Sequence, residues 1–436
     1  MTHSAGTLFA NDRLRTNLDA AVTAFRLSDP EPDQPIPSSA RKRAYRDPRA
    51  GSQLATVSLV QEDAVLKWVY DPPPTSARRT SRRAIAAAAD EDVVHSFQFL
   101  EVPPNQVIEA LAKLDDALTP TRGLRRWRNG AGVAIAKAPA GRLLLLVHGT
   151  FSKGEMFFEE LAATQEGQAF LATAEQTYDA VLTFDHPTLS MSPWLNALDL
   201  SRALDGADGP IDVICHSRGG LVTAWWLFHA RPPVKRVVFV GSPLEGTSLA
   251  APARLKAALD LLGNLARAVG TMRSSAATAV PLLAATGGLI KILGGMLSFG
   301  AGTPLVDAGI AVVPGLASQS RVANNYELLR LFADQWAKPL ELHSVSSDYA
   351  PSAPDAWWKF WQYFRQIPGR IADWGADAIF DGPNDLVVDT ASMTELGRLS
   401  IPAGRRLVYA ADKGVHHCAY FRQPDTVRFL TSVVGL

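Results

Sequence analysis

A single serine between a short apolar run and two glycines is the first feature of this sequence that could carry out chemistry. Residues 211–215 form the apolar run, and Gly219 and Gly220 follow Ser217. Small residues here let a helix approach the preceding strand and leave the serine hydroxyl projecting from a sharp turn. We therefore interpret residues 211–228 as strand, tight turn and helix, with Ser217 as a candidate nucleophile. The alternative is an ordinary strand-to-helix turn that contains a serine.

A serine nucleophile needs a histidine that accepts its proton and a carboxylate that holds this histidine in the right tautomer. Asp385 and His417 follow Ser217 in the order Ser, Asp, His, and each lies beyond the end of an expected strand. This order, at these places, predicts a catalytic triad of Ser217, Asp385 and His417.

A second loop, directly after the apolar run 143–147, is the candidate oxyanion site. The oxyanion needs two N–H donors, normally one after the nucleophile and one from such an early loop. We expect these donors to be the backbone N–H groups of Thr150 and Arg218. We expect the His148 side chain to be a satisfied structural histidine, with the backbone beyond it supplying the donor. The residues expected beside the substrate are His148, Gly149 and Phe151.

The overall composition restricts the class of protein. The 436 residues are 47% hydrophobic and 20% charged, which is typical of a globular chain. Lys plus Arg equals Asp plus Glu at 43 each, so net charge favours neither nucleic acid nor an anionic membrane. Two cysteines provide no disulfide framework and no metal cluster, and residues 1–15 lack the apolar core of a secretory signal. We expect a cytoplasmic protein with no metal, no cofactor and no nucleic-acid partner, and leave the oligomeric state open.

From residue 142 onward, apolar strands alternate with helical segments. This pattern predicts an α/β domain with a mostly parallel sheet covered by helices on both faces, whose ligands bind at the carboxyl ends of the strands. The loop 185–193 lies at such an end. The expected strands are 143–147, 180–184, 211–215, 234–240, 340–346 and 406–409, and the expected helices are 151–173, 194–204, 325–336 and a terminal one.

Residues 1–130 are expected to form a small accessory region, and residues 131–436 the α/β domain. The accessory region contains a proline-rich run at 29–37, which is typical of an extended linker. Its other expected elements are a hairpin at 55–60 and 64–70, a strand at 93–100 and a helix at 104–118. Its role does not follow from these patterns.

Residues 249–320 interrupt the α/β alternation. They contain one apolar helical stripe, and from 274 to 320 only Lys291 and Asp307 are charged. Glycines and prolines divide this stretch into pieces shorter than the roughly 20 residues that a membrane span needs. We expect a helical lid over Ser217 that offers a surface for peripheral contact with a lipid or membrane, while the tryptophan-rich loop at 357–361 supplies a further wall. The alternative is an insertion that is permanently packed and completes the core, or that serves as a dimer interface.

Five segments together are similar to the serine α/β-hydrolase superfamily, particularly its bacterial lipase and GPI-inositol-deacylase-like esterase branches. The resemblance covers residues from about 140 to 436. It departs from the usual pattern where Cys215 replaces the first glycine of the elbow, and in its doubled histidine. The matching segments are 147–150 (Val-His-Gly-Thr), 215–220 (Cys-His-Ser-Arg-Gly-Gly), 241–250, 384–388 (Asn-Asp-Leu-Val-Val) and the histidine loop 414–421.

The resemblance implies an α/β-hydrolase fold and a hydrolase of carboxylic esters with apolar acyl groups, acting through an acyl-enzyme. An acyltransferase with the same triad and a silent binding module remain the alternatives. Residues 384–388 resemble the acid loop of the lipases and favour Asp385, although Asp348 and Asp389 remain alternatives. Residues 414–417 resemble a lipase Gly-Val-X-His loop and favour His417, with His416 as the alternative.

Overall fold

Two compact units make up the chain in the computed structural model. One contains Met1–Leu114 and Lys256–Gly309, and the other contains Asp115–Leu255 and Ile310–Leu436. The expected boundary was at residue 130, whereas the first unit ends at Leu114. The insertion 249–320 was expected to belong to the α/β domain, whereas residues 256–309 belong to the first unit. The structure describes residues 5–29, 54–62, 65–73, 92–250, 258–264, 276–297, 313–321, 325–333, 340–349 and 383–436.

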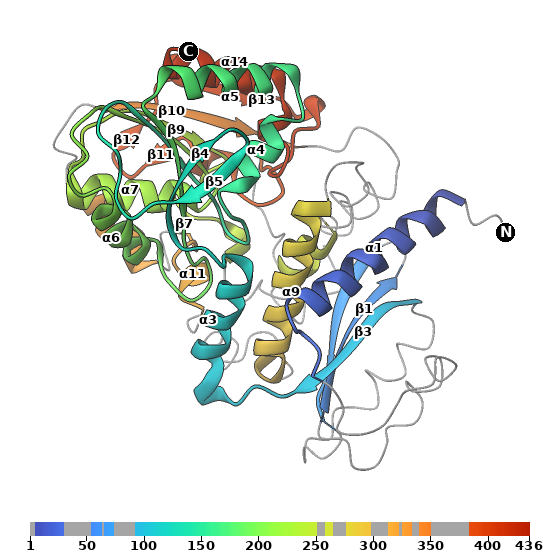
Figure 1. Ribbon diagram of the computed structural model, residues 1–436. Helices are drawn as coiled ribbons and strands as arrows, with labels where there is room; N and C mark the ends of the chain where they lie inside the picture. The colour runs from blue at the N-terminus through green and yellow to red at the C-terminus, as the bar shows by residue number, and fades with distance from the viewer. Residues whose placement is uncertain are drawn as a thin grey trace. The chain divides into compact units, whose positions relative to one another are not determined.

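The second unit is built on a mixed sheet, which among the described residues has eight strands in the order β13-β10-β9-β8-β6-β7-β4-β5 (Figure 1). Six of these strands run parallel to one another, namely β6, β7, β8, β9, β10 and β13. Strand β4 is antiparallel to β7, and β5 is antiparallel to β4. The strands are β4 (Gly123–Arg128), β5 (Ala131–Ala134), β6 (Leu143–Val147), β7 (Ala180–Asp185), β8 (Ile211–His216), β9 (Val234–Val240), β10 (Glu341–Ser347) and β13 (Arg406–Tyr409).

Strand β6 shows why the sheet is covered on both faces. All five of its residues are buried, and successive side chains of a strand point to opposite faces. Leu145 packs in the apolar cluster formed with α6, α7 and α12, whereas Leu144 packs in the cluster formed with α4, α5 and α14. The covering helices are α4 (Glu155–Leu161), α5 (Gln165–Thr177), α6 (Pro193–Ala203), α7 (Gly219–Ala230), α12 (Tyr326–Ala333) and α14 (Pro424–Val434).

The expected α/β domain is therefore confirmed, with two local differences. The single helix expected at 151–173 is divided into α4 and α5, because Thr164 begins a new helix by accepting a hydrogen bond from the Gly167 N–H at 3.1 Å. The first strand of this sheet in chain order, β4, was not expected, because its residues 124–127 read Leu-Arg-Arg-Trp and lack the alternation of apolar and polar residues that is typical of a strand. The remaining short elements are α3 (Val107–Leu118), α11 (Pro314–Ala317), β11 (Glu395–Leu396) and β12 (Leu399–Ser400).

The first unit contains the antiparallel sheet β2-β1-β3, so the expected hairpin and the strand after it are confirmed. Two side chains from the helical segment 258–264 bind the backbone of β2 on its outer edge. Asn264 bridges the N–H and the carbonyl of Leu66, and Asp260 accepts from the Trp68 N–H at 2.8 Å. The elements of this unit are α1 (Ala5–Ala24), β1 (Leu54–Glu62), β2 (Val65–Asp71), β3 (Asp92–Leu100) and α9 (Ala276–Leu297).

Helix α9 occupies the core of the first unit. It contacts α1 and the strands β1 and β2, and residues such as Leu283 and Leu289 are fully buried. Part of the insertion expected over the α/β sheet therefore packs with the accessory strands. No helix in the described part of the chain is long and apolar enough to cross a membrane.

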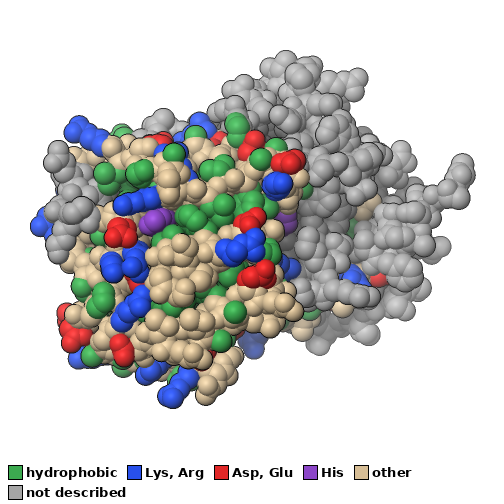
Figure 2. All heavy atoms as spheres, turned by 90° about the horizontal axis from the view of Figure 1, so that it is seen from above, with side chains coloured by type: hydrophobic (Ala, Val, Ile, Leu, Met, Phe, Trp, Pro, Cys, Tyr) green, Lys and Arg blue, Asp and Glu red, His purple; other side chains and the backbone are tan. Residues whose placement is uncertain are grey.

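One face of the described part of the molecule carries mixed charge. On the face that Figure 2 shows, seen from above the view of Figure 1, basic and acidic side chains are interspersed among apolar ones.

Candidate active site

Ser217 lies at the turn between β8 and α7 with a φ of +52°, a left-handed conformation that costs energy for any residue other than glycine. Its N–H donates to the Val240 carbonyl at 2.9 Å. A Cβ on Gly219 would lie 2.2 Å from the Val147 carbonyl oxygen, so this turn requires glycine there. The structure therefore has the strand, tight turn and helix expected for residues 211–228.

The candidate acid and base are in contact. His417 Nδ1 lies 2.7 Å from Asp385 Oδ2, and both side chains are buried. The other carboxylate oxygen of Asp385 accepts from the N–H groups of Val387 and Val388 at 3.0 and 2.8 Å. A carboxylate held in this way fixes the proton of His417 on Nδ1, which leaves Nε2 able to accept another proton.

The histidine loop contacts the elbow through the His216 side chain. His216, the residue before Ser217, has its ring centroid 4.8 Å from that of His417 and its Nε2 3.1 Å from the His417 carbonyl oxygen. Gly241, with a φ of +56°, lies on the other side: a Cβ there would be 3.3 Å from both Asp385 Oδ2 and His417 Nδ1. The site residues on β8, β9 and the later loops thus meet at one end of the sheet.

Tyr420 is a site residue that the sequence analysis missed. Its hydroxyl donates to Asp385 Oδ2 at 2.9 Å. Burial and the nearby Asp385 raise the pKa of Tyr420 well above its ordinary value, so the hydroxyl stays protonated and keeps donating. A tyrosine three residues after the candidate base was the only available signal, and it is not a specific one.

The alternative acid and base residues lie in other surroundings. The Asp389 carboxylate accepts from the Ser248 N–H at 2.9 Å and from Arg321 at 2.8 Å. Asp348 is half-buried just beyond β10, where its N–H donates to the Tyr409 carbonyl. His416 is buried, and its Nδ1 has no hydrogen-bond partner among the described residues. Burial lowers the pKa of His416 to about 4.

The early loop lies against the nucleophile through Gly149. A Cβ on this residue would be 2.7 Å from Ser217 Cβ and 3.3 Å from Ser217 Oγ, so only glycine allows this approach. The Gly149 carbonyl oxygen accepts from His148 Nδ1 at 2.9 Å. Because a trans peptide is planar, the Thr150 N–H points in the opposite direction, away from His148. The orientation of an expected oxyanion donor is thereby fixed.

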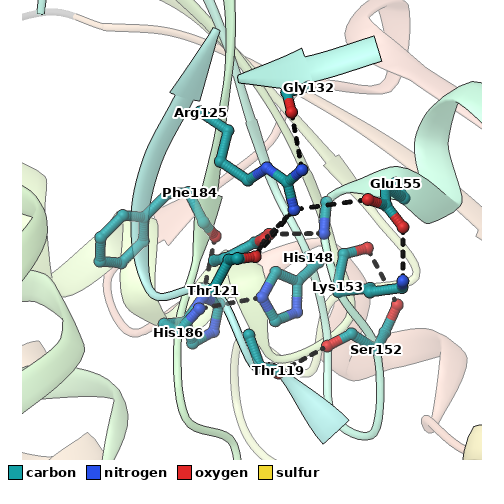
Figure 3. Close-up of polar contacts among 12 residues, drawn as sticks. Thr119, Thr121, Arg125, Gly132, His148, Ser152, Lys153, Glu155, Phe184 and His186 are labelled. Atoms are coloured by element: carbon teal, nitrogen blue, oxygen red, sulfur yellow. Dashed lines mark hydrogen bonds and ion pairs between the residues drawn. The ribbon is translucent and has the colours of Figure 1, made fainter. Parts of the chain in front are cut away.

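The His148 side chain is hydrogen-bonded through both ring nitrogens, as expected for a satisfied structural histidine. It is fully buried, and its Nε2 accepts from the His186 N–H at 3.1 Å (Figure 3). The two imidazole rings stack with centroids 4.1 Å apart. Burial lowers the pKa of both histidines, so the pair is neutral and His148 has a structural role.

Arg218 and Phe151 lie in the two backbone segments of the expected oxyanion site. Arg218 is the N-cap residue of α7, and its buried guanidinium donates to the Met191 carbonyl at 2.6 Å and to Asn196 at 2.7 Å. Burial lowers the pKa of Arg218 to about 10, so the side chain stays charged at neutral pH. Phe151 has a φ of +58°. The expected wall at 357–361 lies outside the described residues.

Within the described part of the chain, no group of three His, Cys, Asp or Glu side chains is arranged to hold a metal ion.

The sheet order, the serine elbow between β8 and α7, and an acid and a histidine on loops after later strands define an α/β-hydrolase fold. The chain belongs to the family described as a domain of unknown function, DUF7379, which matches residues 118–435. None of the curated proteins compared with it matches.

Solved structures of several hydrolases are similar to this chain. The mature form of the Bacillus licheniformis lipase BlEst2 has 16% identity and a TM-score of 0.36, covering 68% of this chain and 93% of its own. Lipase 1 from Pelosinus fermentans has 12% identity and a TM-score of 0.37, covering 66% and 98%. A hydrolase from Oleispira antarctica has 14% identity and a TM-score of 0.37, covering 69% and 93%. Nothing about this chain's substrate follows from such low similarity.

Proposed function

We propose that this protein is a serine hydrolase that cleaves carboxylic esters of apolar acyl groups, with Ser217 as nucleophile, His417 as general base and Asp385 as the orienting acid. The observation that carries the proposal is the 2.7 Å contact between His417 Nδ1 and Asp385 Oδ2, beside a serine held at a φ of +52°. A left-handed serine at a strand-to-helix turn is typical of a hydrolase nucleophile.

The proposed reaction begins when Ser217 Oγ attacks the carbonyl carbon of the ester and His417 Nε2 takes its proton. Asp385 then stabilises the imidazolium, because its carboxylate is already aligned with Nδ1. The carbonyl oxygen, on which negative charge develops, accepts hydrogen bonds from the backbone N–H groups of Thr150 and Arg218. His417 returns the proton to the leaving alcohol, which leaves an acyl-enzyme, and a water activated by the same histidine hydrolyses it.

The preference for apolar acyl groups is proposed from the sequence. It rests on the apolar character of residues 249–320 and on the resemblance of the five motifs to bacterial lipases and GPI-inositol-deacylase-like esterases. Contact with a lipid surface through residues 249–320 belongs to the same proposal.

Hydrolysis of a p-nitrophenyl ester by the full chain tests this function. Replacing Ser217 by Ala should lower turnover by a factor on the order of 10⁴ to 10⁶, because the triad acts as a unit. Ser400→Ala, which changes a serine on β12 bonded to Glu395, is the matched control and should hydrolyse the ester as the parent does. Equal rates for Ser217→Ala and the parent would contradict the assignment. Ester products formed with an added alcohol would indicate acyl transfer instead.

A further inference from the structure

Asp115 is a fully buried carboxylate that none of the proposed chemical steps uses. It lies in the last turn of α3 and accepts hydrogen bonds from three successive backbone N–H groups in the loop after β7. Two hydroxyls of the same loop, on Thr188 and Ser190, also donate to it, at 3.4 and 2.6 Å. The N–H donors are Thr188 at 2.8 Å, Leu189 at 3.0 Å and Ser190 at 2.6 Å.

Charge-assisted hydrogen bonds of this kind are about twice as strong as neutral ones, and Asp115 makes several within one short loop. A buried carboxylate is costly unless its oxygens are satisfied, so loop and carboxylate depend on each other. We therefore interpret the backbone conformation of residues 188–190 as set by Asp115.

The loop ordered by Asp115 in turn holds the segment that carries the first oxyanion donor. Thr188 Oγ1 accepts from the Phe151 N–H at 3.3 Å, one residue after Thr150. The His186 N–H donates to His148 at 3.1 Å, two residues before Thr150. At the start of the loop, Asp185 Oδ1 accepts from the Gly154 N–H at 2.7 Å. The segment is thus anchored on both sides of Thr150.

The same loop also reaches the second oxyanion donor. The Met191 carbonyl, one residue after Ser190, accepts from the Arg218 guanidinium at 2.6 Å. Arg218 is fully buried, and the negative charge of Asp115 is the largest of the charge effects that oppose the lowering of its pKa. Residues 188–191 therefore connect a buried anion to a buried cation, and touch both segments that carry the donors.

We propose that Asp115 is a positioning residue for the oxyanion hole: through residues 186–191 it fixes the Thr150 and Arg218 backbones at the distance that the developing oxyanion requires. It contacts neither the substrate nor the reacting atoms. This inference rests on the proposed ester hydrolysis and adds a residue to it that lies outside the triad and the oxyanion loop.

Asp115→Asn is the decisive variant, because it keeps the shape of the side chain, removes its charge and turns one acceptor into a donor that faces backbone N–H groups. Asp116→Asn, at the adjacent exposed aspartate that pairs with Arg122, is the matched control. The concentration of active enzyme is measured by active-site titration, so that misfolded molecules do not lower the kcat that is calculated. We expect kcat for a p-nitrophenyl ester to fall by about 10- to 100-fold with KM within about twofold, since a misplacement of about 1 Å costs up to 10².

A second readout separates positioning from mere stability. A thionoester develops its charge on sulfur, which is a weaker hydrogen-bond acceptor than oxygen, so the ratio of ester to thionoester turnover reports on the oxyanion donors. This ratio should shrink in Asp115→Asn and stay at the parent value in Asp116→Asn. Thr188→Val removes the acceptor of the Phe151 N–H while keeping Asp115, and should shrink the ratio by a smaller factor. It serves as the test if Asp115→Asn does not fold.

An ester-to-thionoester ratio in Asp115→Asn equal to that of the parent would overturn the proposal. If Asp115→Asn yields no titratable enzyme, the same result in Thr188→Val would overturn it. A parent enzyme without esterase activity would instead overturn the proposed function.

Discussion

Asp385 is the residue on which the proposed base depends most. Both of its oxygens are occupied, one by His417 and Tyr420 and the other by two backbone N–H groups. We predict that Asp385→Asn leaves the fold intact but lowers kcat by about 10² to 10⁴, because the amide no longer fixes the His417 tautomer. Asp348→Asn is the matched comparison, and ester kinetics of the two variants decide between them. A larger loss at Asp348 would transfer the role of the acid to that residue.

Two buried histidines beside the site make stability depend on pH. Burial lowers the pKa of His216 to about 3 and that of His416 to about 4, whereas an unfolded histidine titrates near 6.5. Below pH 6.5 the unfolded chain therefore binds more protons than the folded one, and stability falls as the pH falls. For each histidine the loss is about 1.4 kcal/mol per pH unit between its two pKa values.

Urea denaturation at pH 7 and pH 5 measures this effect. The parent should be less stable at pH 5, and His416→Gln should lose less stability than the parent between the two values. Asp385, His417 and Arg422 are the charged or titratable groups that act on His416, and they are unchanged in this variant. Identical losses for parent and variant would show that His416 is not a buried neutral histidine.

At the scale of elements, the contact between β6 and the start of α7 determines the elbow. A Cβ at position 219 would meet the carbonyl oxygens of Val147 and His148 at 2.2 and 2.7 Å, and backbone atoms cannot move aside as a flexible side chain does. We predict that Gly219→Ala destabilises the fold by about 1–3 kcal/mol, as overpacking does. Gly404→Ala, where nothing lies within 4 Å of the added Cβ, is the control and should unfold as the parent does. Equal midpoints for both variants in thermal unfolding would contradict the close approach.

The strands of the α/β sheet could be predicted because their signal is local. Residues 143–147, 234–240 and 406–409 were expected as strands, and the structure has them with these bounds. Helix α1 was not expected, although Leu14, Leu18 and Ala21 are buried at helical spacing. Charged residues lie between these apolar positions, so the helical periodicity was not recognised in the sequence.

The site was predictable only where spacing in the chain carries information. The turn at Ser217 and the order of Ser217, Asp385 and His417 could be read from the sequence. The contact of Asp115 with residues 188–190 could not, because it joins residues about 75 positions apart and no local pattern marks it. The contact of Tyr420 with Asp385, 35 positions away, is of the same kind.

At the scale of the whole molecule, residues 256–309 belong to the unit formed by residues 1–114. Helix α9 supplies buried residues to that unit, so a variant that lacks α9 would lose part of its core. That residues 249–320 cover Ser217 as a lid stays a prediction. Its test is better made on the full chain than on a deletion variant.

A lid of this kind predicts a preference for medium or long acyl chains and a higher rate on aggregated substrate. Exposing its apolar face costs roughly 25 cal/mol per Å² in water, a cost that contact with a lipid surface removes. Rates should be measured for p-nitrophenyl esters of increasing acyl length, below and above the solubility limit of each. A flat dependence on length with no rise on aggregation would exclude the lid and leave the proposed triad unaffected.

Labelling by a fluorophosphonate probe tests the central claim most directly, because the probe reacts with an activated serine whatever the natural substrate is. The full chain should take up one probe per molecule, and peptide mass spectrometry should find it on Ser217. Ser217→Ala should take up none, and Asp385→Asn should react more slowly than the parent. A parent chain that stays unlabelled, or that carries the probe on another serine, would contradict the account.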